Sequence, residues 1–288
     1  DQVPGVRPKG LPEGVEPKET IVYINGINTT KDAQAQSLQS IADRTGARVV
    51  GIHNSTDGMA ADLLQSARDK MNLGKNPAVD QLADTVYAKI QAGESIHLMA
   101  HSQGGLITSR ALKHVTERLR AEGLSTAQIH ERLGLVHAET FGAAAYHYPD
   151  GPQYEHFINT SDPVPRLAGL GKSTRRDRNA GAGAEVHRFR DNKASRGDLF
   201  GSHDFDLYLE HRERIQQEQA AAGGVHVTPS GGTGTSDGEG ALAPKPSEQQ
   251  APQGGTNQGD KSAAARAAAD VTDTAWSKEL PPSPKDFE

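Results

Sequence analysis

A serine flanked by small residues is the first feature of this 288-residue chain that could do chemistry. Ser102 lies between the apolar run Ile96–Ala100 and an amphipathic stretch at 105–120, which indicates a strand before it and a helix after it. A sharp strand-to-helix turn crowds the positions two before and two after the serine, and these are Ala100 and Gly104. The pattern predicts a nucleophile elbow, and the alternative is a serine that only caps a helix.

A serine hydroxyl needs a base to take its proton and a third group to orient that base. Asp162 follows the apolar run 154–159, and sheet enzymes place their functional groups just beyond the carboxyl ends of strands. His203 follows the last predicted strand and precedes the last predicted helix, which suits a mobile base. Asp162 could instead form only a turn before Pro163. His203 could instead start a helix and pair with Asp204 or Asp206, and His187 in the final strand is the alternative base.

Acyl transfer also requires backbone N–H donors for the oxyanion of the tetrahedral intermediate. The amide of Gln103, the residue after the serine, is one candidate. The second donor is expected from the turn after an early strand, and within Asn25–Thr30 the amide of Ile27 is the predicted donor. Gly26 at this turn permits a close approach of the backbone.

Only position in the architecture separates the remaining histidines. His97 and His137 lie inside apolar strands and are predicted to be packed, whereas His114, His130 and His211 lie on helical stretches and are predicted to face solvent. The His and carboxylate residues show no ligand spacing such as H-E-x-x-H, so no metal site and no cofactor are expected.

Short β-branched runs alternate with amphipathic stretches between residues 20 and 218. This alternation predicts an α/β fold, a mostly parallel, doubly wound sheet with helices on both faces. The predicted strands are Ile21–Asn25, Arg48–His53, Ile96–Ala100, Leu135–Phe141, Tyr154–Asn159 and Glu185–Phe189. The predicted helices are 31–44, 59–71, 77–91, 105–120 and Phe205–Gln219.

Composition divides the chain into three parts. Residues 1–19 are rich in Pro and Gly and are interpreted as a linker, 20–220 as the folded domain, and 221–288 as a low-complexity, largely disordered tail. The tail is expected to act as a solvated tether. The chain opens with Asp1 and shows no signal-peptide pattern, so we expect a processed form or part of something longer.

Charge and cysteine usage exclude several classes. There are 31 basic and 37 acidic side chains, so no nucleic-acid partner is expected. The absence of Cys excludes disulfides, thiolate metal sites and a cysteine nucleophile. Mean hydropathy is −0.65, and no stretch approaches the roughly 18 apolar residues of a membrane span.

The motifs Ala100–Gly105 and Asn159–Pro165 make residues 20–212 resemble bacterial lipase-type α/β-hydrolases, and the second motif is similar to that of class 3 lipases. The order Ser102, Asp162, His203 is also that of α/β-hydrolases. The resemblance implies the α/β-hydrolase fold and a serine ester hydrolase, a lipase, phospholipase or esterase, with these residues as the catalytic triad. Asn25–Gly26 departs from the His-Gly that many lipases carry.

Lipase modules bounded by linkers also resemble the antibacterial phospholipase effectors of secretion systems. This weaker likeness implies a secreted bacterial toxin that meets a membrane surface and is neutralised by an immunity protein. The same triad would serve an acyltransferase or a thioesterase, and a third possibility is a non-catalytic interaction module.

Candidate substrate contacts lie near the triad in the sequence. His101 precedes the serine, and Tyr146 and Tyr148 follow the fourth predicted strand, where they could line an acyl pocket or cover the sheet edge. The segment 169–183 is glycine-rich and is a candidate lid, in which Arg175 and Arg176 could hold an anionic headgroup or simply be solvated.

Overall fold

The computed structural model describes residues 2–27, 29–54, 76–172, 174–192 and 201–223. The chain divides into two units, Asp1–Val225 and His226–Glu288, and every described residue belongs to the first. The helix predicted at 59–71 and the tail beyond residue 223 therefore lie outside the described residues. None of the described helices is long and apolar enough to cross a membrane.

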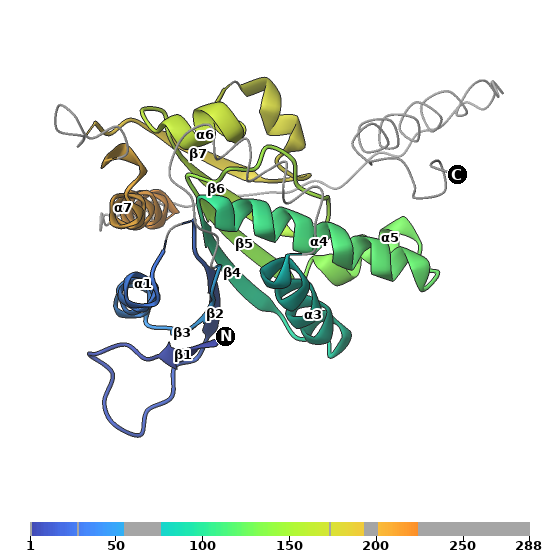
Figure 1. Ribbon diagram of the computed structural model, residues 1–288, viewed down its shortest axis with the longest axis horizontal. Coiled ribbons are helices and arrows are strands. Elements are labelled where there is room, and N and C mark those ends of the chain that lie inside the picture. The colour runs from blue at the N-terminus through green and yellow to red at the C-terminus, as the bar shows by residue number, and fades with distance from the viewer. Residues whose placement is uncertain (1, 28, 55–75, 173, 193–200, 224–288) are drawn as a thin grey trace, which may run out of the picture. The chain divides into compact units, whose positions relative to one another are not determined.

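A seven-stranded sheet forms the centre of the first unit (Figure 1). Its strands are β1 (Gln2–Val6), β2 (Thr20–Ile24), β3 (Arg48–Ile52), β4 (Ile96–His101), β5 (Val136–Phe141), β6 (Gln153–Asn159) and β7 (Glu185–Phe189). The spatial order is β1-β3-β2-β4-β5-β6-β7, with β1 antiparallel to β3 and every other neighbour parallel. This is the doubly wound, mostly parallel sheet of the α/β-hydrolase fold, so the predicted fold class is confirmed.

The first strand corrects the interpretation of residues 1–19 as a linker. Gln2–Val6 pairs with β3, with Gln2 opposite Ile52 and Val6 opposite Val49. An edge strand is paired along only one side, so it tolerates a proline such as Pro4. Because Pro and Gly interrupt the apolar alternation here, the sequence pattern alone did not indicate a strand.

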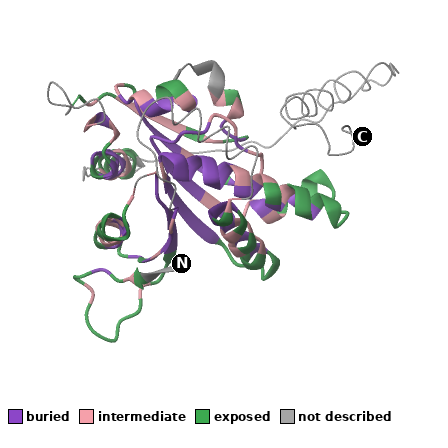
Figure 2. Ribbon diagram, in the orientation of Figure 1, coloured by how far each residue is buried: buried purple, intermediate pink, exposed green. Residues whose placement is uncertain are grey.

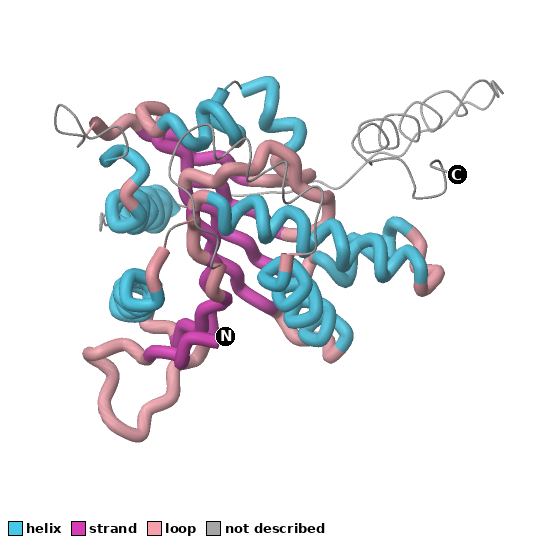
Figure 3. Tube along the Cα trace, viewed as in Figure 1, coloured by secondary structure: helices cyan, strands magenta, loops and turns pink. Residues whose placement is uncertain are grey.

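Helices cover both faces of the sheet (Figures 1 and 3). They are α1 (Lys31–Thr45), α3 (Pro77–Gln91), α4 (Gln103–Ala121), α5 (Thr126–Leu133), α6 (Pro163–Ala168) and α7 (Phe205–Gly223), with 3-10 turns η1 (Leu170–Lys172), η2 (Thr174–Asn179) and η3 (Gly201–His203). The bounds of α3 are those predicted, since Asn76 caps the helix and Pro77 is its first residue. Helix α5 was not predicted, although Ser125 and Gln128 form a capping box at its start.

The two faces of the sheet bury separate apolar clusters (Figure 2). Leu82 of α3 and Leu112 of α4 pack with Leu98 on one face. On the other face, Leu38 of α1 and Tyr208 of α7 are buried in the second cluster. Burial on both faces explains why the central strands read as continuous apolar runs, and it holds α4 and α7 at fixed positions on opposite sides of β4.

The burial of the histidines tests which faces of these elements were predicted to be buried. His97 is buried and His114 and His130 are exposed, as predicted. The prediction for His211 is wrong, because α7 turns this side chain toward the sheet. There it stacks on Phe189 with ring centroids 3.8 Å apart, and its Nε2 lies 2.9 Å from Asp191 Oδ2.

Candidate active site

Ser102 occupies a strained turn between β4 and α4. Its φ of 57° and ψ of −123° make it the one non-glycine residue with positive φ in the described part of the chain. The turn is held by the loop after β5, because Ser102 N–H donates to Phe141 O at 3.0 Å and Ser102 O accepts from Ala144 N–H at 2.9 Å. Strand, strained serine and helix have the geometry of a nucleophile elbow.

Two glycines after the serine allow the first turn of α4 to lie in close contact with β2 and with the loop after β5. A Cβ on Gly104 would lie 2.2 Å from the carbonyl oxygen of Ile24 in β2, and one on Gly105 would lie 2.4 Å from Ala143 Cβ. Helix α4 therefore starts at Gln103, earlier than the predicted residue 105, and directly beside the backbone of β2.

Asp162 uses its two carboxylate oxygens for different tasks. It is fully buried at the start of α6, where Oδ1 accepts from Val164 N–H at 2.8 Å. Oδ2 lies 2.6 Å from His203 Nδ1 and accepts a hydrogen bond from the Tyr208 hydroxyl at 2.7 Å. The sequence posed two alternatives for Asp162, a turn before Pro163 or a contact with a histidine. Its side chain makes both contacts.

His203 ends η3 with its two ring nitrogens in different surroundings. Since Nδ1 faces Asp162, Nε2 is the nitrogen that remains to exchange a proton, and it is buried with no hydrogen-bond partner among the described residues. Ser102 Oγ therefore makes no hydrogen bond to Nε2 in this structure. Such contacts often shorten only when substrate binds. His187, the alternative base, instead faces Glu155 and Glu185, each at 3.6 Å.

The loop after β5 connects the serine with the acid. Gly142 has φ 53°, and a Cβ there would lie 2.8 Å from Asp162 Oδ2. Its neighbours Phe141 and Ala144 hydrogen-bond to Ser102. On the other side, the His101 ring lies tilted against that of His203, with ring centroids 4.6 Å apart. Ser102, Asp162 and His203 therefore gather at one edge of the sheet, beyond the carboxyl ends of β4, β6 and β7.

A buried amide network shapes the turn that was predicted to supply an oxyanion donor. Asn25 Oδ1 accepts from Asn54 N–H at 2.8 Å, and Asn54 Nδ2 donates to Gln103 Oε1 at 2.6 Å. A Cβ on Gly26 would lie 2.9 Å from Ser102 Cβ. The structure thus brings the turn before Ile27 against the serine, next to Gln103 in the first turn of α4.

The pKa values of two side chains at the site are shifted. Burial and the nearby charge of His203 hold the pKa of His101 well below its usual value, so its neutral ring donates from Nε2 to His203 O at 3.0 Å. Burial and the charge of Asp162 raise the pKa of Tyr208 well above 10, so its hydroxyl stays protonated.

The residues predicted to contact substrate differ in how far their side chains are buried. Tyr148 is buried, with its ring edge-on to Tyr154 and tilted against His156. Its hydroxyl would lie 3.3 Å from a Cβ on Gly105. Tyr146 is half-buried against the same cluster. Arg175 and Arg176 lie in η2, and their side chains are outside what the structure describes.

Much of the predicted lid is anchored to the domain. Asn179 O accepts from Tyr148 N–H at 2.8 Å, and Ala182 N–H donates to Asp150 Oδ1 at 2.7 Å. A Cβ on Gly169 would lie 2.2 Å from Ala143 O, so this glycine allows close packing. Gly181 and Gly183 have positive φ and so permit tight turns here, and the role of 169–183 as a lid stays a prediction.

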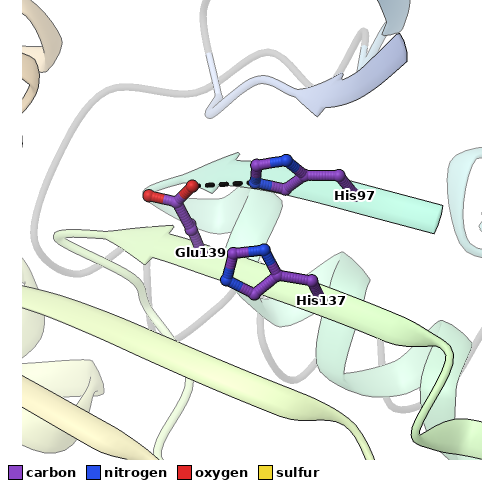
Figure 4. Close-up of side chains that lie close together, drawn as sticks. All are labelled: His97, His137 and Glu139. Carbon is purple, nitrogen blue, oxygen red and sulfur yellow. Dashed lines mark hydrogen bonds and ion pairs between the residues drawn. The ribbon is translucent and has the colours of Figure 1, made fainter. Parts of the chain in front are cut away.

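A second polar cluster lies at the opposite ends of the strands (Figure 4). One ligand atom from each of His97, His137 and Glu139 lies within 4.8 Å of the others. However, His97 places Nε2 2.7 Å from Glu139 and Nδ1 2.6 Å from Glu19, and Arg212 donates to both oxygens of Glu139.

The orientation of the rings also argues against a metal at this cluster. The His97 and His137 rings stack with centroids 4.4 Å apart, so their in-plane lone pairs do not converge on one point. Burial lowers the pKa of His97, but hydrogen bonds and charge from Glu139 and Glu19 outweigh it and raise the pKa. The cluster is a buried ion network and does not fit a metal site.

Sequence reasoning missed Tyr208, Asn54 and Gly142. Tyr208 carries the one usable signal, since it shares a helical face with the apolar residues Phe205 and Leu209 after His203. Asn54 and Gly142 follow strand ends, but neither has a neighbouring motif that indicates its partner.

No protein-family model matches the sequence, and no curated protein matches it. Solved structures with similar backbones include an esterase from Pyrobaculum calidifontis, with 14% identity over 74% of this chain and 78% of that chain and a TM-score of 0.40. The apo form of Thermogutta terrifontis esterase 2 has 14% identity, 78% and 90% coverage and a TM-score of 0.42. A putative dienelactone hydrolase from Klebsiella pneumoniae has 11% identity, 75% and 91% coverage and a TM-score of 0.44. The assignment of the fold rests on the strand order described above.

Proposed function

We propose that the chain is a serine carboxylic-ester hydrolase that works through an acyl-enzyme. The observation that supports this best is the buried Asp162 carboxylate, 2.6 Å from His203 Nδ1, at the sheet edge where Ser102 adopts its strained turn. This arrangement leaves His203 Nε2 to take the serine proton. Such a set of three residues is suited to acyl transfer.

The reaction uses His203 twice. Ser102 Oγ attacks the ester carbonyl carbon while its proton passes to His203 Nε2, and the oxyanion is met by the amides of Gln103 and Ile27. The protonated His203 gives this proton to the leaving alcohol, and the acyl group remains on Ser102. Water then attacks the acyl carbonyl and loses a proton to His203. Cleavage of the acyl bond returns that proton to Ser102 and releases the acid.

We propose an amphiphilic ester such as a phospholipid as the substrate. Leu167 of α6 is 65% exposed, only five residues after Asp162, and Arg166 beside it is also exposed. An apolar and a cationic side chain next to the site would suit an acyl chain and an anionic headgroup. The same triad could pass the acyl group to another acceptor, so the experiment must identify products.

A fluorophosphonate probe tests the nucleophile without requiring the natural substrate. Ser102 Oγ would bond to phosphorus, fluoride would leave, and His203 would take the proton. We expect one adduct on Ser102 in the wild type and in Ser109→Ala, and none in Ser102→Ala. Ser109 is a matched control because it is a buried serine on the same helix, with its hydroxyl donating to His147 O. An adduct elsewhere, or none in the wild type, would remove the triad assignment.

Product analysis tests the substrate class. Wild type and Ser102→Ala are incubated with phosphatidylglycerol vesicles, with short-chain esters and with an acyl-thioester, each with and without added alcohol, and the products are identified by mass spectrometry. Free fatty acid and lysophospholipid from the wild type alone would support a phospholipase. Turnover of short esters alone would leave an esterase, and transfer to the alcohol in preference to water would replace hydrolysis by acyl transfer.

A further inference from the structure

The acid of the triad has a second partner on the oxygen that faces His203. Asp162 Oδ2 lies 2.6 Å from His203 Nδ1 and 2.7 Å from the Tyr208 hydroxyl. Tyr208 has no exposed surface, and it lies on α7, five residues after His203 in the chain. One continuous segment therefore supplies both groups that contact this carboxylate oxygen.

The direction of the hydrogen bonds around Tyr208 is fixed. Its oxygen lies 3.1 Å from the backbone N–H of Asn159, which can only donate. The phenolic hydrogen is therefore left for Asp162. Burial, together with the charge of Asp162, raises the pKa of Tyr208 well above 10, so this hydrogen is retained across the working range of pH.

We propose that Tyr208 is a positioning residue: its hydroxyl orients the Asp162 carboxylate toward His203 and takes up part of its negative charge, and so sets how strongly protonated His203 is stabilised. This inference rests on the proposed function only in assigning His203 as the base. Charge-assisted hydrogen bonds are short and about twice as strong as neutral ones, so a second donor competes with His203 for the same oxygen.

Packing leaves Tyr208 little freedom to turn away. A Cβ on Gly142 would lie 2.9 Å from the Tyr208 hydroxyl, and Phe189 of β7 meets the tyrosine ring edge-on, with centroids 5.3 Å apart. Among the described residues, the titratable groups near the pair are His203 from η3 and His101 from β4, whose ring centroid is 6.3 Å from that of Tyr208. The loop after β5 and the end of β6 contribute backbone at Gly142 and Asn159.

Tyr208→Phe tests the hydroxyl with the ring retained. Loss of the donor leaves Asp162 with more charge to stabilise protonated His203, so the acid limb of the kcat/KM profile is expected to move to higher pH. We expect kcat to fall about tenfold while KM stays within about twofold, because a hydrogen bond to a charged group is lost and no substrate contact is removed.

Tyr154→Phe is the matched control. Tyr154 is as deeply buried, and its hydroxyl donates to Pro149 O at 2.9 Å in the other core cluster. Both variants lose one buried hydroxyl, so both are expected to unfold at somewhat lower temperature. Only Tyr208→Phe should move the pH profile, and equal kinetic effects in the two variants would overturn the inference.

An NMR titration of the His203 imidazole provides a readout that does not depend on hydrolysis. We expect its midpoint to move to higher pH in Tyr208→Phe and to stay in place in Tyr154→Phe. A fluorotyrosine placed site-specifically at position 208 is a stronger donor and should move it to lower pH. An unchanged midpoint in Tyr208→Phe would overturn the inference. If the wild type hydrolysed no ester, the proposed function would fail, and the titration would still decide the role of Tyr208.

Discussion

The Cα of Gly26 faces the serine so closely that an added methyl group would lie 2.9 Å from Ser102 Cβ and 3.3 Å from Oγ. We expect Gly26→Ala to displace the hydroxyl and lower kcat about a hundredfold, since misplacing a reacting group by about 1 Å can have an effect of that size. The free energy of unfolding should also fall, by about 1–3 kcal/mol, because the added methyl group overpacks a site where both Gly26 and Ser102 are buried.

Gly10→Ala is the control for that substitution. Its added Cβ would meet nothing within 4 Å, and its φ is not positive. Steady-state hydrolysis and urea unfolding of both variants check the expectation. Full activity in Gly26→Ala would show that this turn does not constrain the nucleophile.

At the scale of single residues, the sequence indicated those with a local pattern. Ser102 has small neighbours on both sides, and Asp162 and His203 each follow a predicted strand, so the structure could bring all three to one sheet edge. Tyr208 lies 46 residues from Asp162, and the direction of its side chain depends on how α7 is rotated about its own axis. A partner at that distance leaves no mark on local spacing, which is why the sequence did not identify it.

Among the elements, α7 is fixed to the sheet by charge as well as by apolar contact. Arg212 donates to both oxygens of Glu139 on β5, and Glu139 is fully buried. We expect Arg212→Leu to lower the free energy of unfolding by about 3–5 kcal/mol, because it leaves a buried carboxylate without the guanidinium that donates to both of its oxygens.

A double-mutant cycle in urea checks this expectation. Arg212→Leu combined with Glu139→Leu should be more stable than Arg212→Leu alone, since the buried carboxylate that lost its guanidinium partner is then also removed. The exposed pair of Arg118 with Asp84 gives the comparison, and Arg118→Leu should change the free energy of unfolding by less than about 1 kcal/mol. Similar effects for Arg212→Leu and Arg118→Leu would contradict a structural role for the buried network.

Elements with strong periodicity or caps were predicted well, whereas others depended on tertiary contacts. Helix α3 has the predicted bounds because Asn76 and Pro77 define its start. Strand β1 was missed because its residues gain order by pairing with β3. The burial of His211 follows from packing on the sheet, which the polar residues around it in the helix conceal.

For the whole molecule, buried neutral histidines make stability depend on pH. Burial lowers the pKa of His156 to about 4, and its ring bridges Thr140 and Ala180 O. The unfolded chain takes up a proton near the usual value of 6.5, so its proton uptake exceeds that of the folded chain as pH falls. The free energy of unfolding should therefore drop by about 2 kcal/mol between about pH 7.5 and pH 5 on this account alone.

Urea unfolding at the two pH values measures this slope. His156→Gln, which cannot titrate, should be less stable at the higher pH and should lose less on acidification than the wild type. His97 acts in the opposite sense, because the contribution from its raised pKa is lost as pH rises. An equal slope in wild type and His156→Gln would assign the acid sensitivity to other groups.

The first unit is expected to fold without the second. The buried side chains of α7 lie between Phe205 and Arg212, and residues 217–222 are exposed. A chain that ends at residue 223 should keep the melting temperature and the ester hydrolysis of the full chain, as measured by calorimetry and a chromogenic ester. Loss of either would show that the segment 224–288 supports the first unit.

The short path from His203 to Tyr208 also restricts how the chain can change in length. An α-helix advances about 100° per residue, so one residue inserted between Phe205 and Tyr208 would rotate the hydroxyl away from Asp162 and carry Arg212 off Glu139. When homologous sequences are aligned, gaps should therefore be scarce across 201–212 and fall in the flanking stretches. Positions in this stretch other than His203, Tyr208 and Arg212 can accept substitutions more readily than the stretch as a whole can accept insertions or deletions.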